Sequence, residues 1–101
     1  MKGRRTKALE IPRKVKIAVF ERDNERCILC GSNGLPEAHY IPRSKGGLGI
    51  EQNIVTLCRE CHRRYDQTTD RPNIREFLRQ YLMKKYPEWD EQNLYYRKDS
   101  Q

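Results

Sequence analysis

The sequence has few apolar residues and no long apolar run. Hydrophobic residues make up 36% of its 101 residues, and charged residues make up 35%. No segment approaches the roughly 20 apolar residues that cross a bilayer, which excludes an integral membrane protein. The longest apolar stretch near the N-terminus, residues 17–20, is too short for the core of a signal peptide, so we expect a cytoplasmic protein. A chain this small and polar buries only a thin core and needs a further source of stability, such as a metal site or a partner.

Acidic residues are also sparse, since 14 of them stand against 21 lysines and arginines, for a net charge of +7. The excess is concentrated in residues 1–16, which contain seven basic side chains and one acid, Glu10. Residues 1–11 are predicted to form a disordered basic arm, followed by a single domain over 12–101. A basic arm indicates a polyanionic partner, with nucleic acid first and Arg4 and Arg5 as candidate phosphate contacts. A tail that only adds solubility is the alternative.

Four cysteines occur as two Cys-x-x-Cys pairs, Cys27 with Cys30 and Cys58 with Cys61. Each such turn aims two thiolates at one point, and two turns complete a tetrahedral zinc site with Zn–S distances of about 2.3 Å. Because four thiolates leave no open position on the ion, we expect this zinc to be structural. An iron–sulfur centre, a redox dithiol and paired disulfides are the alternatives.

The spacing of apolar, proline and glycine residues predicts a small α+β domain. Helices are expected over residues 13–23, 58–68 and 74–86, the last with Asn73 as its N-cap. A strand is expected over 35–41, and a second strand or an extended run over 53–57. Residues 43–49 are expected to form a glycine-rich loop between them. Residues 89–96 are expected to form a short helix or to fold back on the core, which gives a C-terminal helical extension over 73–96.

The segment between the cysteine pairs contains both histidines of the chain. His39 stands three residues before Pro42, Gly46-Gly47 and Asn53-Ile-Val-Thr-Leu follow, and His62 comes directly after the last cysteine. This order resembles the zinc-containing branch of the HNH, or ββα-metal, nuclease family, with Ile54 in place of the usual leucine. The resemblance covers residues 27–66 and implies a ββα core with a four-cysteine zinc, in a small bacterial or phage protein.

The resemblance also implies a metal-dependent DNA endonuclease. His39 would be the general base, because an imidazole titrates near neutrality, and Asn53 would orient its ring through the side-chain amide or backbone carbonyl. His62 would be a ligand of a divalent ion that bridges a phosphate oxygen and the leaving oxygen. Asp66, one helical turn after His62, is a candidate second ligand. Mg²⁺ or Mn²⁺ is the expected catalytic ion, with Ni²⁺ as an alternative.

One position departs from the family pattern. The residue before the catalytic histidine is commonly Asp or His and binds the metal, whereas here it is Ala38. Glu37 is a candidate replacement, because residues two apart share a face of a regular strand. Otherwise His62, Asp66 and water hold the ion, or the site is degenerate.

Basic side chains flank the motif and are candidate DNA contacts: Arg43, Lys45, Arg59, Arg63 and Arg64. The resemblance implies double-stranded DNA that is nicked or cut with low sequence specificity, and allows a protein partner from phage packaging or defence machinery. A competing hypothesis is a non-catalytic, zinc-containing nucleic-acid-binding module with a degenerate HNH site. It explains the cysteines and the charge, but not His39 and Asn53 in register with His62. A third hypothesis is an adaptor that docks through helix 74–86.

Overall fold

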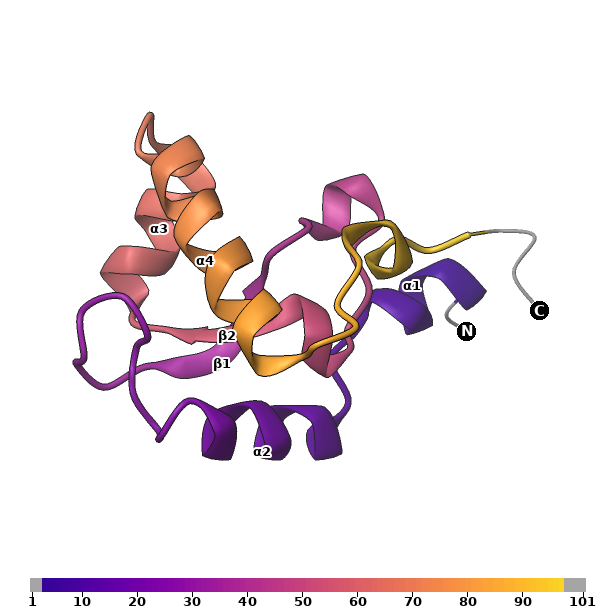
Figure 1. Ribbon diagram of the computed structural model, residues 1–101. Helices are drawn as coiled ribbons and strands as arrows, with labels where there is room; N and C mark the ends of the chain where they lie inside the picture. Colours follow the sequence, from indigo (N-terminus) through magenta and orange to yellow (C-terminus); the bar gives the residue numbers. More distant parts are fainter. Residues whose placement is uncertain (1–2, 98–101) are drawn as a thin grey trace.

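A computed structural model describes residues 3–97 of the chain. Its helices and strands follow in the order α1 (Arg4–Leu9), α2 (Arg13–Arg22), β1 (Leu35–His39), β2 (Ile54–Leu57), α3 (Arg59–Gln67) and α4 (Arg71–Lys85). The two strands pair antiparallel, with α2 on one side of the sheet and α3 and α4 on the other (Figure 1). The predicted α+β fold is confirmed, and β1, β2 and α3 make up its ββα unit.

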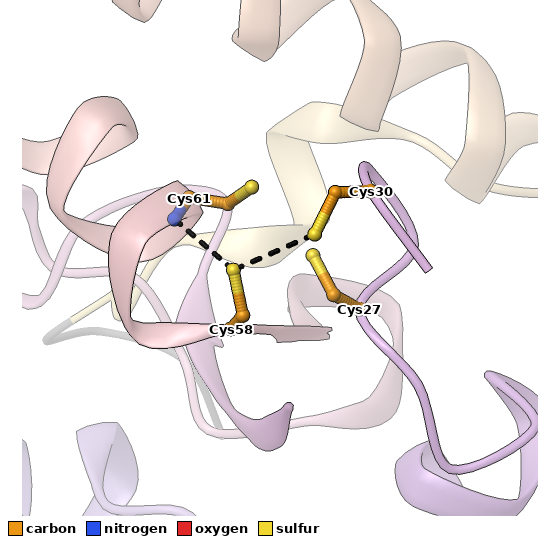
Figure 2. Close-up of side chains that lie close together, drawn as sticks. All are labelled: Cys27, Cys30, Cys58 and Cys61. Atoms are coloured by element: carbon orange, nitrogen blue, oxygen red, sulfur yellow. Dashed lines mark hydrogen bonds between the residues drawn. The ribbon is translucent and has the colours of Figure 1, made fainter. Parts of the chain in front are cut away.

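Two cysteine-containing turns lie at one end of the sheet. The first follows α2, where Gly31 has a φ of +81° and its N–H donates to the carbonyl of Cys27. A left-handed conformation of this kind suits glycine, which has no Cβ to clash. The second turn begins α3, with Cys58 as the N-cap residue and its thiol accepting from the N–H of Cys61. The four thiols converge between these two turns (Figure 2), so a bound ion would tie α3 to a stretch without regular structure.

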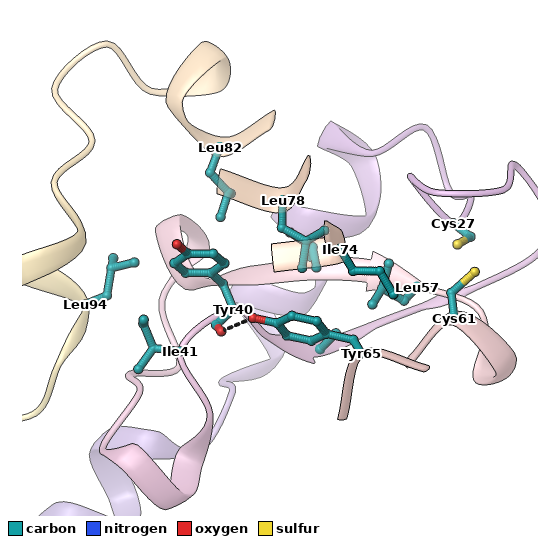
Figure 3. Close-up of a cluster of buried hydrophobic side chains, with 12 residues drawn as sticks. Cys27, Tyr40, Ile41, Leu57, Cys61, Tyr65, Ile74, Leu78, Leu82 and Leu94 are labelled. Atoms are coloured by element: carbon teal, nitrogen blue, oxygen red, sulfur yellow. Dashed lines mark hydrogen bonds between the residues drawn. The ribbon is translucent and has the colours of Figure 1, made fainter. Parts of the chain in front are cut away.

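The core is thin and lies between the sheet and the two last helices. Tyr40 and Tyr65 occupy its centre, and Leu78 and Leu82 cover them from α4 (Figure 3). The hydroxyl of Tyr65 donates a 2.6 Å hydrogen bond to the backbone carbonyl of Tyr40, which satisfies two buried polar groups at once. This bond fixes α3 against the end of β1.

A buried ion pair joins α2 to the sheet. The guanidinium of Arg22 donates to the carboxylate of Asp23 at 2.7 Å and to the carbonyl of Ile54, also at 2.7 Å. Asp23 also accepts from the N–H of Thr56 at 2.8 Å and from the hydroxyl of Tyr81 at 2.6 Å. Because each charge has several partners, the desolvation cost of burying the pair is offset.

The predicted disorder of the basic arm over residues 1–11 is wrong for its described part. Residues Arg4–Leu9 form α1, and the side chain of Leu9 is only 3% exposed. Ile11 packs against the cluster of Val15, Val19 and Ile54, which holds the other end of the arm. Charged residues dominate the composition of this segment, but its apolar residues Leu9 and Ile11 pack against the rest of the domain. Residues 1–2 and 98–101, which belong to the predicted arm and the predicted domain, lie outside the described residues.

The remaining elements differ from the predictions mainly at their ends. Helix α4 starts at Arg71 rather than Ile74, and Asn73 is not its N-cap, because Pro72 fits within the first turn of a helix. Short 3-10 helices occur at Arg43–Lys45 and Glu51–Asn53 between the strands, and at Glu91–Leu94 near the C-terminus. Leu94 of the last one is buried, so the C-terminal segment folds back on the core. Among residues 3–97, no helix is long and apolar enough to cross a membrane.

Candidate active site and metal centre

The four cysteines form a cluster with the geometry of a metal site. Their sulfur atoms all lie within 4.8 Å of one another, and those of Cys30 and Cys58 are 3.6 Å apart. Tetrahedral zinc with Zn–S bonds of about 2.3 Å places its sulfurs about 3.8 Å apart, so the cluster fits this ion closely. The structure therefore brings together all four predicted ligands, as Figure 2 shows.

The surroundings of the thiols also favour a bound cation. Hydrogen bonding by Ser32 lowers the pKa of Cys30 to about 6, and the N–H of Cys61 lowers the pKa of Cys58. Burial, with three other sulfurs nearby, raises the pKa of Cys61 instead. Four thiolates so close together repel one another, and a cation at their centre removes this conflict. Cys30 and Cys58 thus ionise more readily than an ordinary thiol, whereas a nearby cation would be needed to favour the thiolate of Cys61.

A second group of predicted residues lines a single open cavity of about 900 Å³. Its walls come from the end of the arm, α2, β1, the loop after β1, α3 and the first residue of α4. Six of the residues predicted from the sequence line it: Glu37, His39, Arg43, Lys45, His62 and Asp66. The fold therefore collects acidic, imidazole and cationic groups from distant parts of the chain in one place.

His39 occupies the last position of β1 and is partly buried. Its Nε2 lies 2.9 Å from the backbone carbonyl of Leu9, which can only accept a hydrogen bond. In this contact Nε2 carries the proton, and Nδ1 keeps the lone pair. Burial lowers the pKa of His39 below its usual value, the charge of Arg43 acts in the same direction, and the Leu9 carbonyl opposes them. The ring is therefore neutral at pH 7, which is the form a general base requires.

The predicted role of Asn53 in orienting the His39 ring is not what the hydrogen bonds indicate. The side chain of Asn53 accepts from the N–H of Ile41 at 2.7 Å and donates to the carbonyls of Ile41 and Leu48. Its backbone carbonyl accepts from the N–H of Tyr40 at 2.7 Å. Asn53 is fully buried and pins the loop after β1, while Leu9 is the partner of the imidazole.

His62 and Asp66 form a pair on successive turns of α3. Nε2 of His62 lies 3.1 Å from a carboxylate oxygen of Asp66, and both side chains are partly exposed to the cavity. Two such donors suit a hard divalent ion that keeps water and substrate oxygens as its other ligands. Among residues 3–97, the four cysteines are the one group of three or more such donors that lies within binding distance. These two side chains would therefore give a second ion two neighbouring protein ligands rather than a complete cage.

Ala38, the residue that departs from the family pattern, lies on the face of β1 that is turned to the core. Ala38 is 1% exposed and packs in the core, opposite Val55 of β2. Glu37 and His39, on either side of it, both line the cavity, as the alternation of a strand predicts. The carboxylate of Glu37 lies 3.5 Å from Nζ of Lys16 in α2, so its nearest charge is a lysine.

Two of the three arginines of α3 form ion pairs with neighbouring acidic side chains. Arg63 is paired with Glu60 at 2.6 Å, and Arg64 with Asp70 at 3.1 Å. Arg59 is exposed at the start of the helix. Both ion pairs are at the surface, where such pairs contribute little to stability.

The basic residues of the arm lie beside the cavity rather than on a free tail. Arg4 and Arg5 are exposed on α1, and the guanidinium of Arg5 lies 3.5 Å from the backbone carbonyl of Arg43. Arg43 and Lys45 themselves line the cavity. The positive charge of the arm is therefore continuous with that of the cavity wall.

Three charged residues of the cavity are not among the site residues predicted from the sequence. Glu10 and Lys16 line it from the arm and α2, and Arg71 lines it from the start of α4. Arg71 donates to the carbonyl of Tyr65 at 2.8 Å and its guanidinium lies 4.2 Å from the centre of that ring. None of the three is within the motif, so no spacing signal could have found them.

Comparison with known proteins agrees with this geometry. The sequence profile of a family described as HNH endonuclease matches residues 27–78. A protein named "Anaredoxin" from Nostoc sp. (strain PCC 7120 / SAG 25.82 / UTEX 2576) is similar over 67 residues at 33% identity, which is 64% of this chain and 88% of that protein. The family match covers half of the chain, from the first cysteine through the ββα unit into α4. This chain therefore belongs to the HNH endonuclease family.

Proposed function

We propose that this protein is a divalent-metal-dependent endonuclease that hydrolyses phosphodiester bonds in double-stranded DNA. The observation that carries the proposal is that one cavity is lined by a neutral imidazole, His39, and by the adjacent pair of His62 and Asp66. Hydrolysis of a phosphodiester needs a base for the attacking water and a cation for the developing charge. The cavity offers a group for each task.

His39 acts as the general base. Nδ1 of its ring has the lone pair, since Nε2 is engaged by the carbonyl of Leu9. It takes a proton from the water that attacks the phosphorus. Asn53 supports the site indirectly, because its three side-chain hydrogen bonds hold the loop that follows β1. The products are a 5′-phosphate and a 3′-hydroxyl.

His62 and Asp66 are the residues that would hold the catalytic ion, Mg²⁺ or Mn²⁺, with Ni²⁺ as an alternative. When bound, the ion neutralises charge on the phosphate and stabilises the leaving oxygen. Glu37 is a third candidate, which would have to leave Lys16 to reach the ion. Arg43 and Lys45 line the cavity and contact DNA phosphates there, with Arg4, Arg5, Arg59, Arg63 and Arg64 further out. Contacts of this kind read the backbone rather than the bases, so sequence specificity is low.

The four cysteines hold a zinc ion with a structural role. The sulfur cluster fits tetrahedral zinc, and four thiolates leave no position for water or substrate. This ion and the catalytic ion are therefore chemically separate, and each can be tested without the other.

Cleavage of supercoiled plasmid tests the proposal. The zinc-loaded wild-type chain should nick the plasmid in Mg²⁺ or Mn²⁺, and it should not cut when no divalent ion is added to the reaction. His39→Ala should lower the rate by about 10²–10⁴-fold, which is the usual contribution of a general base. Glu88→Gln, an exposed acidic residue outside the cavity, is the matched surface control and should cut at the wild-type rate.

Two results would refute the proposal. Cleavage by His39→Ala at the wild-type rate would exclude His39 as the base. A wild-type protein that shifts DNA in a gel and cuts it with none of Mg²⁺, Mn²⁺ and Ni²⁺ would favour a binding module with a degenerate site.

A further inference from the structure

The N-terminal arm reaches a group that belongs to the active site. Residues 3–11 precede the family match, which begins at residue 27, yet the carbonyl of Leu9 lies 2.9 Å from Nε2 of His39. Within residues 3–97, the His39 ring makes no other hydrogen bond to the protein. The arm and the catalytic histidine are separated by 30 residues of sequence, so the contact is a tertiary one.

We propose that the arm is a positioning element of the nuclease site, in which the Leu9 carbonyl fixes the tautomer and the orientation of the His39 ring. The inference rests on the proposed function of His39 as the base. A carbonyl on Nε2 selects the Nε2–H tautomer and leaves the lone pair on Nδ1. Without this partner the neutral ring would exchange between tautomers and rotate about its side-chain bonds, and part of the population would lack a base facing the substrate.

The arm is held in place on both sides of Leu9. The N–H of Gly49 donates to the carbonyl of Ala8 at 3.1 Å. The carbonyl of Glu10 then passes so close to Gly49 that a Cβ there would lie 1.8 Å from its oxygen. Gly49 is therefore required for this approach, since any larger residue would push the arm away. The buried side chain of Leu9 completes the attachment.

This docking accounts for a glycine that the motif does not explain. Gly49 has no left-handed backbone angle, and it lies beyond the Gly46-Gly47 pair of the family pattern. Its function in the structure is to accept the backbone of the arm at van der Waals distance. The backbone of the arm at Ala8 and Glu10 and the backbone of Gly49 thus form one contact.

Nuclear magnetic resonance of the imidazole nitrogens tests the contact directly. The chain has two histidines, so a His62→Gln variant assigns the signals of His39 in a long-range ¹H–¹⁵N spectrum. At a pH where both rings are neutral, wild-type His39 should show Nε2 as the protonated nitrogen. An Nδ1–H tautomer, or an even mixture of the two, would overturn the proposal.

Gly49→Ala breaks the contact from the other side. It should move His39 toward a mixture of tautomers, and it should lower kcat for plasmid cleavage roughly 100-fold with KM within about twofold, the pattern of a misplaced catalytic group. Gly3→Ala is the matched control, because a Cβ at Gly3 meets nothing within 4 Å, and it should behave as wild type. If Gly49→Ala does not fold, Leu9→Ala serves as the second variant, with the same expected shift in tautomer.

The two readouts separate this inference from the proposed function. A Gly49→Ala protein that is folded and keeps the wild-type tautomer and kcat would show that the arm is not a positioning element. The spectra report on the contact even if no DNA is cut, and a complete lack of cleavage by the wild type counts against the proposed function instead.

Discussion

The hydroxyl of Tyr65 links α3 to the backbone next to His39. It donates at 2.6 Å to the carbonyl of Tyr40, and both tyrosines are fully buried. Tyr65→Phe leaves that carbonyl without its partner, so the free energy of unfolding should fall by about 1–3 kcal/mol. Urea denaturation measures this change. Tyr95→Phe is the control, since the Tyr95 hydroxyl makes no hydrogen bond to residues 3–97, and an equal loss in both variants would contradict the assignment.

Asp66 is the proposed partner of His62 in holding the catalytic ion. Asp66→Asn keeps the size of the side chain and removes the negative charge that lies 3.1 Å from His62. The apparent affinity for Mn²⁺ in cleavage reactions should fall by about 10–100-fold, in line with other losses around metal ligands. A titration of the cleavage rate with Mn²⁺ measures this affinity. An unchanged midpoint would remove Asp66 from the ligand set.

Single residues show where sequence reasoning works and where it stops. The pairing of Glu37 and His39 on one face of a strand follows from the alternation of side chains, and the structure has it so. The hydrogen-bond partner of the His39 ring cannot be predicted from the sequence, because the Leu9 carbonyl is a backbone group with no sequence signature. Arg71 enters the cavity for a similar reason, through the packing of α4 on α3.

Among the elements, the loop between the strands depends on one buried amide. Asn53 makes three side-chain hydrogen bonds, to the backbone of Ile41 and Leu48. Asn53→Ala leaves these buried groups unpaired, so the free energy of unfolding should fall by about 3 kcal/mol or more. Chemical denaturation checks this value, with the exposed Asn93→Ala as control. A loss below about 0.5 kcal/mol, the range of ordinary surface substitutions, would be incompatible with this role.

The elements within the motif were easier to predict than the arm. Helices α2 and α3 lie within one or two residues of their predicted ends, because apolar spacing and the cysteine turns define them. The arm was predicted to be disordered because seven basic side chains dominate residues 1–16. Its attachment depends on Leu9, Ile11 and a distant Gly49, and a local pattern cannot reveal a tertiary contact of that kind.

For the whole molecule, the metal in the cysteine cluster should decide whether the chain folds. The core is small, and the segment from Asp23 to Gly34 has little regular structure apart from its cysteine turn. Structural zinc contributes on the order of 10 kcal/mol to small domains, so its removal by a strong chelator should unfold the protein. Circular dichroism with thermal melting checks this, and added Zn²⁺ should restore the signal. A stripped protein that melts at the original temperature would contradict the structural role.

Single-turnover cleavage of an end-labelled DNA duplex by wild type and His39→Ala, each at full zinc occupancy, tests directly whether His39 is the general base. With His39 as the base, we expect metal-dependent cleavage to 5′-phosphate and 3′-hydroxyl ends, with the rate of the variant lower by about 10²–10⁴-fold. Equal binding of the duplex by both proteins would show that His39 acts in the reaction rather than in affinity. Equal cleavage rates would exclude His39 as the base, and products ending in a 3′-phosphate would exclude the proposed direction of cleavage.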